Sequence, residues 1–124
     1  MAKQIITQKD IALQKLMHYC AYQERCHQEV RTKLISLEIY GEDLEEIIAE
    51  LITENFLNEE RFAQSFARGK FRTKKWGRKR IIIELKLRQI SKYNLQLALK
   101  EIPDSEYYKT FEALAEKRLA QLVG

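Results

Sequence analysis

The apolar pattern of the sequence coincides with itself when the chain is shifted by 51 residues. Six apolar residues, Val30, Leu34, Ile39, Leu44, Ile48 and Leu51, fall on six others, Ile81, Leu85, Ile90, Leu95, Leu99 and Ile102. The spacing within each set is helical, so the matching stretch contains two helices and the loop between them. A period of this length is typical of proteins built from stacked helical units that bury their apolar faces against their neighbours.

Helices are expected along almost the whole chain, because only four Gly and one Pro interrupt it and strand-like alternation is absent. The pattern predicts them at about 8–24, 27–38, 44–54, 59–74, 78–89, 92–101 and 105–122. N-caps are expected at Thr7, Asp43, Asn58 and Ser91, whose side chains can accept a hydrogen bond from the first turn of a helix. The sequence thus predicts an all-α fold of tandem three-helix repeats that form an extended, curved helical array.

Three repeats are expected to divide the chain. Residues 1–57 are predicted to form the first three-helix repeat, 58–103 the second, and 104–124 the first helix of an incomplete third repeat. With 124 residues, of which 45% are hydrophobic, the chain can bury a core. No apolar run approaches the roughly 20 residues that a membrane span needs, so a cytoplasmic protein is expected.

The charge of the chain inverts near its middle. Residues 38–60 hold nine carboxylates and no Lys or Arg, whereas residues 61–88 hold eleven bases and one acid, Glu84. The formal net charge of +4 therefore conceals a strongly acidic block that is joined directly to a strongly basic one. Segregation on this scale indicates a surface that meets a polyanion, or a protein that carries one.

The basic block can be placed on helical faces from its spacing. Arg61, Arg68, Arg72 and Lys75 fall within a stripe of roughly 60° on a helix that turns by 100° per residue, and Phe66 points elsewhere. No acid is interleaved among these four residues, which favours contact with phosphates or an acidic surface over simple solvation. On the next helix, Arg80, Glu84 and Arg88 have the spacing of an intrahelical ion-pair ladder.

Trp76 is the only tryptophan and precedes Gly77 at a predicted turn between helices. We expect it to pack this turn against the core of its repeat, with base stacking or partner contact as the alternative. Gly77 is expected to let the chain turn without a Cβ penalty. Gly69 lies inside a predicted helix, which hints at a close approach by a neighbouring helix or a ligand.

Catalytic and metal chemistry is sparse in this sequence. Cys20, Cys26 and His27 do not have the spacing of a zinc site, and a fourth ligand is not evident. The two cysteines are expected to be reduced, part-buried thiols. His18 has no serine or cysteine at a catalytic spacing, and the chain has no glycine-rich phosphate loop. We therefore expect neither an enzyme nor a bound cofactor, but a binding protein that is a monomer.

Two runs in the middle of the chain carry a family resemblance. LNEERFA at residues 57–63 and KKWGRKRI at 74–81, followed by Leu85 and Ile90, resemble the central motif of the RecX family of bacterial recombination regulators. The stretch from Glu29 to Leu34 and the loop to Ile39 also resemble the first repeat of that family. The resemblance covers about residues 12–118.

The resemblance implies a fold, a partner and a role. Members of the RecX family are small proteins of tandem three-helix repeats that bind the RecA recombinase filament and restrain its recombination and coprotease activities in DNA repair and the SOS response. The implied partners are the RecA filament and single- or double-stranded DNA. Two alternatives remain: an autonomous nucleic-acid-binding helical domain, and a protein scaffold whose charges only confer solubility.

The candidate residues follow from the basic block and the family motif together. The basic residues expected to bind nucleic acid or recombinase are Arg61, Arg68, Lys70, Arg72, Lys74, Lys75, Arg78 and Lys79. The residues expected to form the structural part of the motif are Phe62, Trp76, Gly77, Ile81 and Leu85. The chain departs from the family at Lys70, where Arg is usual, at Arg78, where Pro or Gly often stands, and at Cys26, where Ser commonly caps a helix. Lysine cannot form the two-pronged bond of arginine, so a bidentate contact at Lys70 is not expected.

Overall fold

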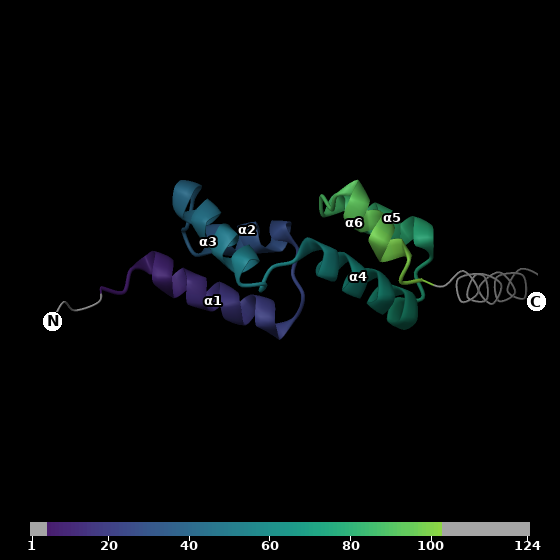
Figure 1. The fold of residues 1–124 in the computed structure, drawn as a ribbon, viewed down its shortest axis with the longest axis horizontal. Coiled ribbons are helices and arrows are strands. Elements are labelled where there is room, and N and C mark those ends of the chain that lie inside the picture. Colours follow the sequence, from purple (N-terminus) through teal and green to yellow (C-terminus); the bar gives the residue numbers. More distant parts are fainter. Residues whose placement is uncertain (1–4, 103–124) are drawn as a thin grey trace, which may run out of the picture. The chain divides into compact units, whose positions relative to one another are not determined.

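A computed structural model of the chain describes residues 5–102, and all regular structure in this range is helical. The α-helices are α1 (Gln8–Tyr22), α2 (His27–Ser36), α3 (Gly41–Thr53), α4 (Glu59–Gly69), α5 (Arg78–Leu87) and α6 (Lys92–Leu99) (Figure 1). A short π-helical segment, η1 (Lys70–Lys74), follows α4 directly. The all-α prediction and six of the predicted helices are confirmed, whereas the helix predicted at 105–122 lies outside the described residues.

The chain divides into two compact units, the first ending at Phe62 and the second beginning at Ala63. The predicted boundaries, at residues 57 and 103, follow the repeat and stay predictions, and the segment 104–124 lies outside the described residues. Each unit is described by itself below.

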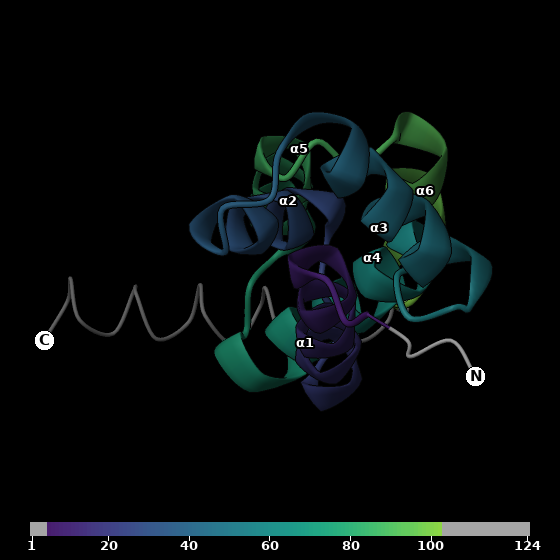
Figure 2. The ribbon, with the colours of Figure 1, turned by 90° about the vertical axis from the view of Figure 1, so that its left-hand side faces the viewer.

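In the first unit, α1, α2 and α3 all pack on one another (Figures 1 and 2). Their buried side chains form one cluster that consists of Ala12, Leu16, Cys20, Val30, Leu34, Ile39, Leu44, Ile47, Ile48, Leu51 and Leu57. The helices are amphipathic because these residues recur at intervals of three and four positions, which places them on one face of each helix. The apolar stripe thus decides which face of α3 turns inward and leaves its acidic face in water.

In the second unit, α5 packs against α6, and the buried side chains come from α4, η1, α5, α6 and the segments that follow them. They are Ala63, Ala67, Phe71, Ile81, Leu85, Ile90, Leu95, Ala98 and Ile102. Five of the six repeat positions in this unit belong to this set, which confirms that the 51-residue period records core positions.

The helix N-termini repeat the same period. The residues that precede the helices pair at 51 positions, Thr7 with Asn58, Cys26 with Gly77, and Tyr40 with Ser91. The predicted caps are confirmed at Thr7, Asn58 and Ser91, whose side chains accept backbone N–H groups three residues on. The cap predicted at Asp43 is wrong, because α3 already begins at Gly41 and Asp43 lies in its first turn. Gly41 has a φ of 60°, a conformation that glycine adopts without a Cβ penalty.

The helix C-termini also repeat. Glu38 and Gln89 follow α2 and α5 with φ angles of 63° and 59°. After each, an amide turns back to the last turn of the helix: Ile39 N–H donates to the Leu34 carbonyl at 3.0 Å. The amide of Ile90, 51 residues further along the chain, donates to the Leu85 carbonyl at 3.1 Å. The loop between the second and third helix of each unit is therefore the same structure built from different surface residues.

The end of the basic helix differs from the sequence prediction. The helix widens into η1 and stops at Lys75, which has a φ of 59°, while the amides of Lys75 and Trp76 both donate to the Lys70 carbonyl. The turn therefore needs no glycine at Gly77, whose φ of −79° any residue can adopt, so that expectation is wrong. Outside its own helix backbone and chain neighbours, no atom of residues 5–102 lies within 4 Å of a Cβ built on Gly69, so the expected approach of a neighbouring helix is not found among the described residues.

Candidate functional site

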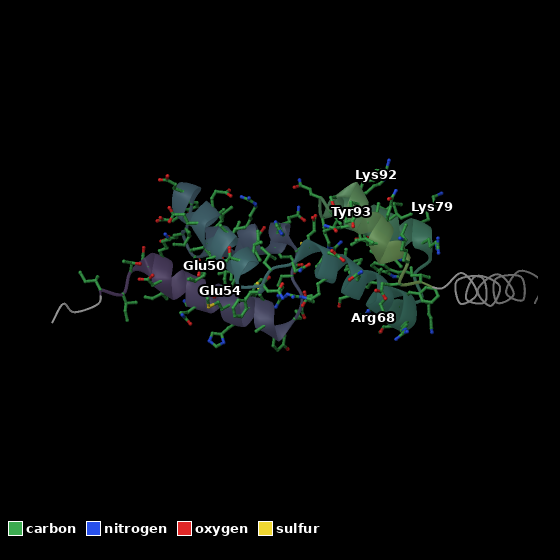
Figure 3. The ribbon with its side chains drawn as sticks, viewed as in Figure 1. Glu50, Glu54, Arg68, Lys79, Lys92 and Tyr93 are labelled. Atoms are coloured by element: carbon green, nitrogen blue, oxygen red, sulfur yellow. The ribbon has the colours of Figure 1, made fainter. Side chains whose placement is uncertain are left out.

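The predicted basic residues differ in exposure and in partners. Arg68, Arg72, Lys74, Lys75 and Lys79 are exposed, and Arg61, Lys70 and Arg78 are half-buried (Figure 3 labels Arg68 and Lys79). The predicted stripe assumed one regular helix, but Lys75 lies beyond the end of η1 in a left-handed conformation. The four stripe residues therefore do not share one regular helix.

Arg61 belongs to the first unit and forms a clamp there. Its Nε donates to both carboxylate oxygens of Glu24, at 2.7 and 2.9 Å. Its Nη2 donates to the backbone carbonyls of Asn55 at 2.9 Å and of Phe56 at 3.3 Å. One guanidinium thus ties the segment after α1 to the segment after α3, since its planar fork can reach several acceptors at once.

Two further arginines contact acceptors within the second unit. Arg68 Nη1 lies 3.3 Å from a carboxylate oxygen of Glu101, and both side chains are partly exposed. Arg78 Nη2 donates to the carbonyl of Ile102 at 3.2 Å, which ties the start of α5 to the segment after α6. Arg68 and Arg78 thus find their acceptors 33 and 24 positions away in the sequence, and not on their own helices.

Four exposed bases have a different environment. Arg72, Lys74, Lys75 and Lys79 form no ion pair with any carboxylate in residues 5–102. Arg72 and Lys74 lie in η1, Lys75 follows it, and Lys79 lies in the first turn of α5. With Arg80, which is also exposed and has no described acid, they place five bases within residues 72–80, around the turn from η1 to α5.

An aromatic cluster lies beside this turn. The Phe66 and Trp76 rings meet edge to face, with centroids 6.1 Å apart. The Arg80 guanidinium carbon lies 4.1 Å from the Trp76 centroid, and Lys70 Nζ lies 5.2 Å from it. Arg88 stacks over Phe66 at 4.7 Å. Trp76 is half-buried at the surface and is held by one ring and two cations, unlike the fully buried Ile81 and Leu85.

The predicted ion-pair ladder on α5 is present in one of its two steps. Arg88 Nη1 donates to a carboxylate oxygen of Glu84 at 3.0 Å. Arg80 stacks on Trp76, and no ion pair joins it to Glu84 among the described residues. Sequence spacing predicted the wrong partner for Arg80, because its partner Trp76 lies in the turn before α5 and not on the helix itself.

A shallow groove of about 250 Å³ runs along the same part of α4 and η1. It is lined by Ser65, Phe66, Gly69, Lys70, Thr73 and Lys74. Two of these residues, Phe66 and Lys70, also belong to the aromatic cluster. Hydroxyl groups, amines and one aromatic ring thus face the same open space.

The first unit holds a related cluster at the positions 51 residues earlier. Tyr19, Arg25 and Glu29 correspond to Lys70, Trp76 and Arg80. The Arg25 guanidinium carbon lies 3.7 Å from the Tyr19 centroid, and its Nη1 lies 3.7 Å from a carboxylate oxygen of Glu29. A cation on a ring therefore recurs in both units, but the ring and the cation exchange positions.

The exposed face of α3 carries five residues of the acidic block, which are Glu42, Asp43, Glu45, Glu46 and Glu50. Glu45 accepts two bonds from Arg31, at 2.6 and 3.2 Å, and these bonds hold the pKa of Glu45 below its usual value. Glu46 accepts a bond from Lys9 of α1 and raises the pKa of that amine. Glu50 and Glu54, at the end of this face, form no ion pair with any described base (Figure 3).

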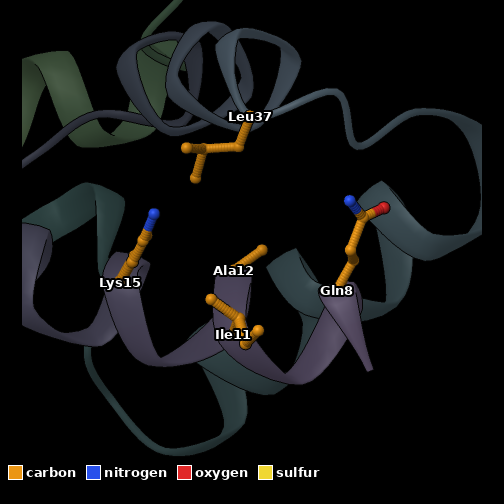
Figure 4. Close-up of a pocket in the computed structure, with 5 residues that line it drawn as sticks. All are labelled: Gln8, Ile11, Ala12, Lys15 and Leu37. Carbon is orange, nitrogen blue, oxygen red and sulfur yellow. The ribbon is translucent and has the colours of Figure 1, made fainter. Parts of the chain in front are cut away.

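A second hollow, of about 170 Å³, lies in the first unit between α1 and the end of α2 (Figure 4). Its lining residues are Gln8, Ile11, Ala12, Lys15 and Leu37. The Gln8 amide and the Lys15 amine do not converge on a common point there, so the hollow has no evident ligand-binding chemistry.

The two cysteines are free and buried. Burial raises the pKa of the Cys20 thiol to about 11 and also raises that of Cys26, so both are protonated at neutral pH. Cys26 precedes α2, and its amide donates to the Glu29 carboxylate. Within the described range, no three His, Cys, Asp or Glu side chains gather as a metal site would require. None of the helices in residues 5–102 combines the length and apolarity of a bilayer span.

Comparison with known proteins connects this arrangement to one family. Residues 58–99 match the family model of RecX, second three-helix domain. The regulatory protein RecX of Enterococcus faecalis is 32% identical over 110 residues, which cover 89% of this chain and 41% of that protein. The chain belongs to the RecX family. The RecX of Oceanobacillus iheyensis is 30% identical and is covered to 43%, so the chain spans about two fifths of the curated relatives it matches.

A solved structure agrees with the assignment. The crystal structure of RecX from Lactobacillus salivarius matches with a TM-score of 0.85 and 28% identity, over 96% of this chain and 77% of the other. The RecX resemblance predicted from the two central runs is therefore confirmed. The relatives are named as regulatory proteins and not as enzymes, in agreement with the prediction for this chain.

Proposed function

We propose that this RecX chain binds the RecA recombinase filament and restrains its recombination and coprotease activities, as the family resemblance implies. The observation that carries the proposal is the group of exposed, unpaired bases around the turn from η1 to α5, because a DNA-bearing filament is a polyanion. We expect the protein to act as a monomer in the cytoplasm, where such filaments form on DNA.

The proposed contact residues are the exposed members of the basic set. Arg72, Lys74, Lys75 and Lys79 would contact phosphates or acidic side chains directly, because no described carboxylate competes for them. Arg68 would contribute less, because part of its charge is balanced by Glu101.

The test measures binding of the chain to RecA filaments on single-stranded DNA over a range of salt concentrations. Arg68→Ala combined with Arg72→Ala is expected to weaken binding about tenfold and to reduce the salt slope by about one to two, because each lost phosphate contact removes released counterions. The matched control is Lys92→Ala with Lys100→Ala, which removes the same charge from exposed positions around α6. An equal loss in both double variants, or no loss in a folded Arg68 and Arg72 variant, would refute the assignment.

An autonomous nucleic-acid-binding domain is the second candidate, and the cluster of Phe66 and Trp76 with adjacent cations favours it. Binding to the same DNA without recombinase distinguishes the two functions. If the chain binds bare DNA as tightly as the filament, the second candidate is correct.

A further inference from the structure

Two cations share the Trp76 ring without an acid between them. Lys70 Nζ and the Arg80 guanidinium carbon lie within 5.2 Å of the ring centroid. No carboxylate of residues 5–102 pairs with either cation. An aromatic ring attracts each cation, but it does not neutralise the charge of the pair. The site therefore has a net positive charge and favours an external anion.

The first unit has an acid in its corresponding cluster, where two cations, Arg25 and Lys33, lie over the Tyr19 ring at 3.7 and 5.7 Å from its centroid. There the stacked arginine, Arg25, meets the carboxylate of Glu29 at 3.7 Å, and this carboxylate also accepts the amide of Cys26. The residue 51 positions after Glu29 is Arg80. The second unit thus has a cation at the position where the first unit has the acid that pairs with its stacked arginine.

We propose that Lys70, Trp76 and Arg80 bind the phosphodiester backbone of single-stranded nucleic acid. The proposed site deepens the proposed function, because it gives the chain a place to bind a DNA strand. It rests on that function in one respect, namely that the RecA filament carries such a strand. The site differs from the predicted stripe, since neither Trp76 nor Arg80 belongs to it.

The groove next to the site favours a nucleic-acid strand over an acidic protein segment. It continues from Lys70 to Lys74 past the hydroxyl of Thr73, and no side chain of the described residues fills the space above Gly69. Cations that follow a groove beside partly exposed aromatic rings are the combination by which proteins bind single strands, because phosphates pair with the cations and bases stack on the rings. An acidic peptide would pair with the same cations but carries no bases to stack on partly exposed rings.

The sole tryptophan makes the site directly observable. Titration of the whole chain with an oligothymidylate should quench Trp76 fluorescence. Arg80→Glu, which restores the acid of the first unit, should weaken this binding about tenfold and lower the salt slope by about one. Lys86→Glu changes an exposed residue of the same helix by the same charge and should weaken binding by no more than about twofold. Circular dichroism melts establish that both variants fold, and Arg80→Gln replaces Arg80→Glu if that variant does not.

Each other outcome identifies a different error. Equal weakening by Arg80→Glu and Lys86→Glu would show general charge attraction and overturn the site. Quenching by poly-glutamate at the same affinity, with competition against the oligothymidylate, would assign the site to an acidic protein. Normal filament binding by a chain that shows no oligothymidylate response would overturn this inference and leave the proposed function intact.

Discussion

Arg61→Ala is expected to destabilise the first unit, although the residue belongs to the basic run of the family motif. The substitution removes two bonds to Glu24 and two to backbone carbonyls, at 2.7 to 3.3 Å. The carbonyl bonds contribute about 0.5–1.5 kcal/mol each. The ion pair adds about 0.2–1 kcal/mol, because the side chains of Arg61 and Glu24 are 38% and 29% exposed and water screens them. Because water would hydrogen-bond to some of these acceptors in the variant, the expected loss in the free energy of unfolding is about 1–3 kcal/mol.

Thermal and urea denaturation measure this loss. For a chain of this size, each kcal/mol lowers the melting temperature by roughly 4 °C. Arg61→Lys keeps the charge but cannot reach the carboxylate and both carbonyls together, so it should lose at least half as much stability. Arg72→Ala is the matched control, because that arginine is exposed and unpaired, and it should melt like the parent. An Arg61→Ala chain that melts like the parent but binds filaments less tightly would refute the clamp and place Arg61 on the binding surface.

Two further predictions concern the acidic face and the core. Because Arg31 holds the pKa of Glu45 down, the pair stabilises the fold at a pH above the pKa of the unfolded carboxyl, and this stabilisation is lost as the pH falls through the lowered pKa. Arg31→Ala should raise the Glu45 pKa in an NMR titration. An unchanged pKa would contradict the pairing. Leu85→Ala should cost about 2–5 kcal/mol in urea denaturation because Leu85 is fully buried, whereas Ile83→Ala on the same helix is half exposed and should cost under half as much. Equal losses would show that the second unit does not pack as described.

The helices and three of the four predicted caps were predictable because their causes are local, whereas the cap predicted at Asp43 was wrong. Thr7 and Asp10 form a reciprocal capping box, and Ser91 accepts the Asn94 amide, so these two helix starts depend on residues three positions apart. The repeat was predictable for a related reason. An apolar residue at Leu34 or Leu85 marks a core position in the sequence itself, whatever lies on the surface.

The candidate site was predictable only in part, because its geometry depends on contacts that are distant in sequence. A helix that turns by 100° per residue describes α4, but the π-type bonds of η1 change the turn after Gly69, so Arg72 cannot be placed by extrapolation. Glu24 and Glu101 meet Arg61 and Arg68 across 37 and 33 residues, and helical spacing cannot show such pairs. Comparison of Glu29 with the residue 51 positions later was the one sequence signal that could have identified Arg80.

The two units show that the fold and the charge pattern are set by different residues of the same repeat. Core positions keep their apolar character at an offset of 51, and the loop after α2 and α5 has the same hydrogen bonds in both units. Surface positions have no such constraint, so Tyr19 can become Lys70 and Arg25 can become Trp76 while a cation still lies on a ring. The charges around the ring differ as well, since the stacked arginine pairs with an acid in the first unit only. A three-helix unit can therefore gain or lose an acid beside its stacked cations through a surface position, without any change in its core.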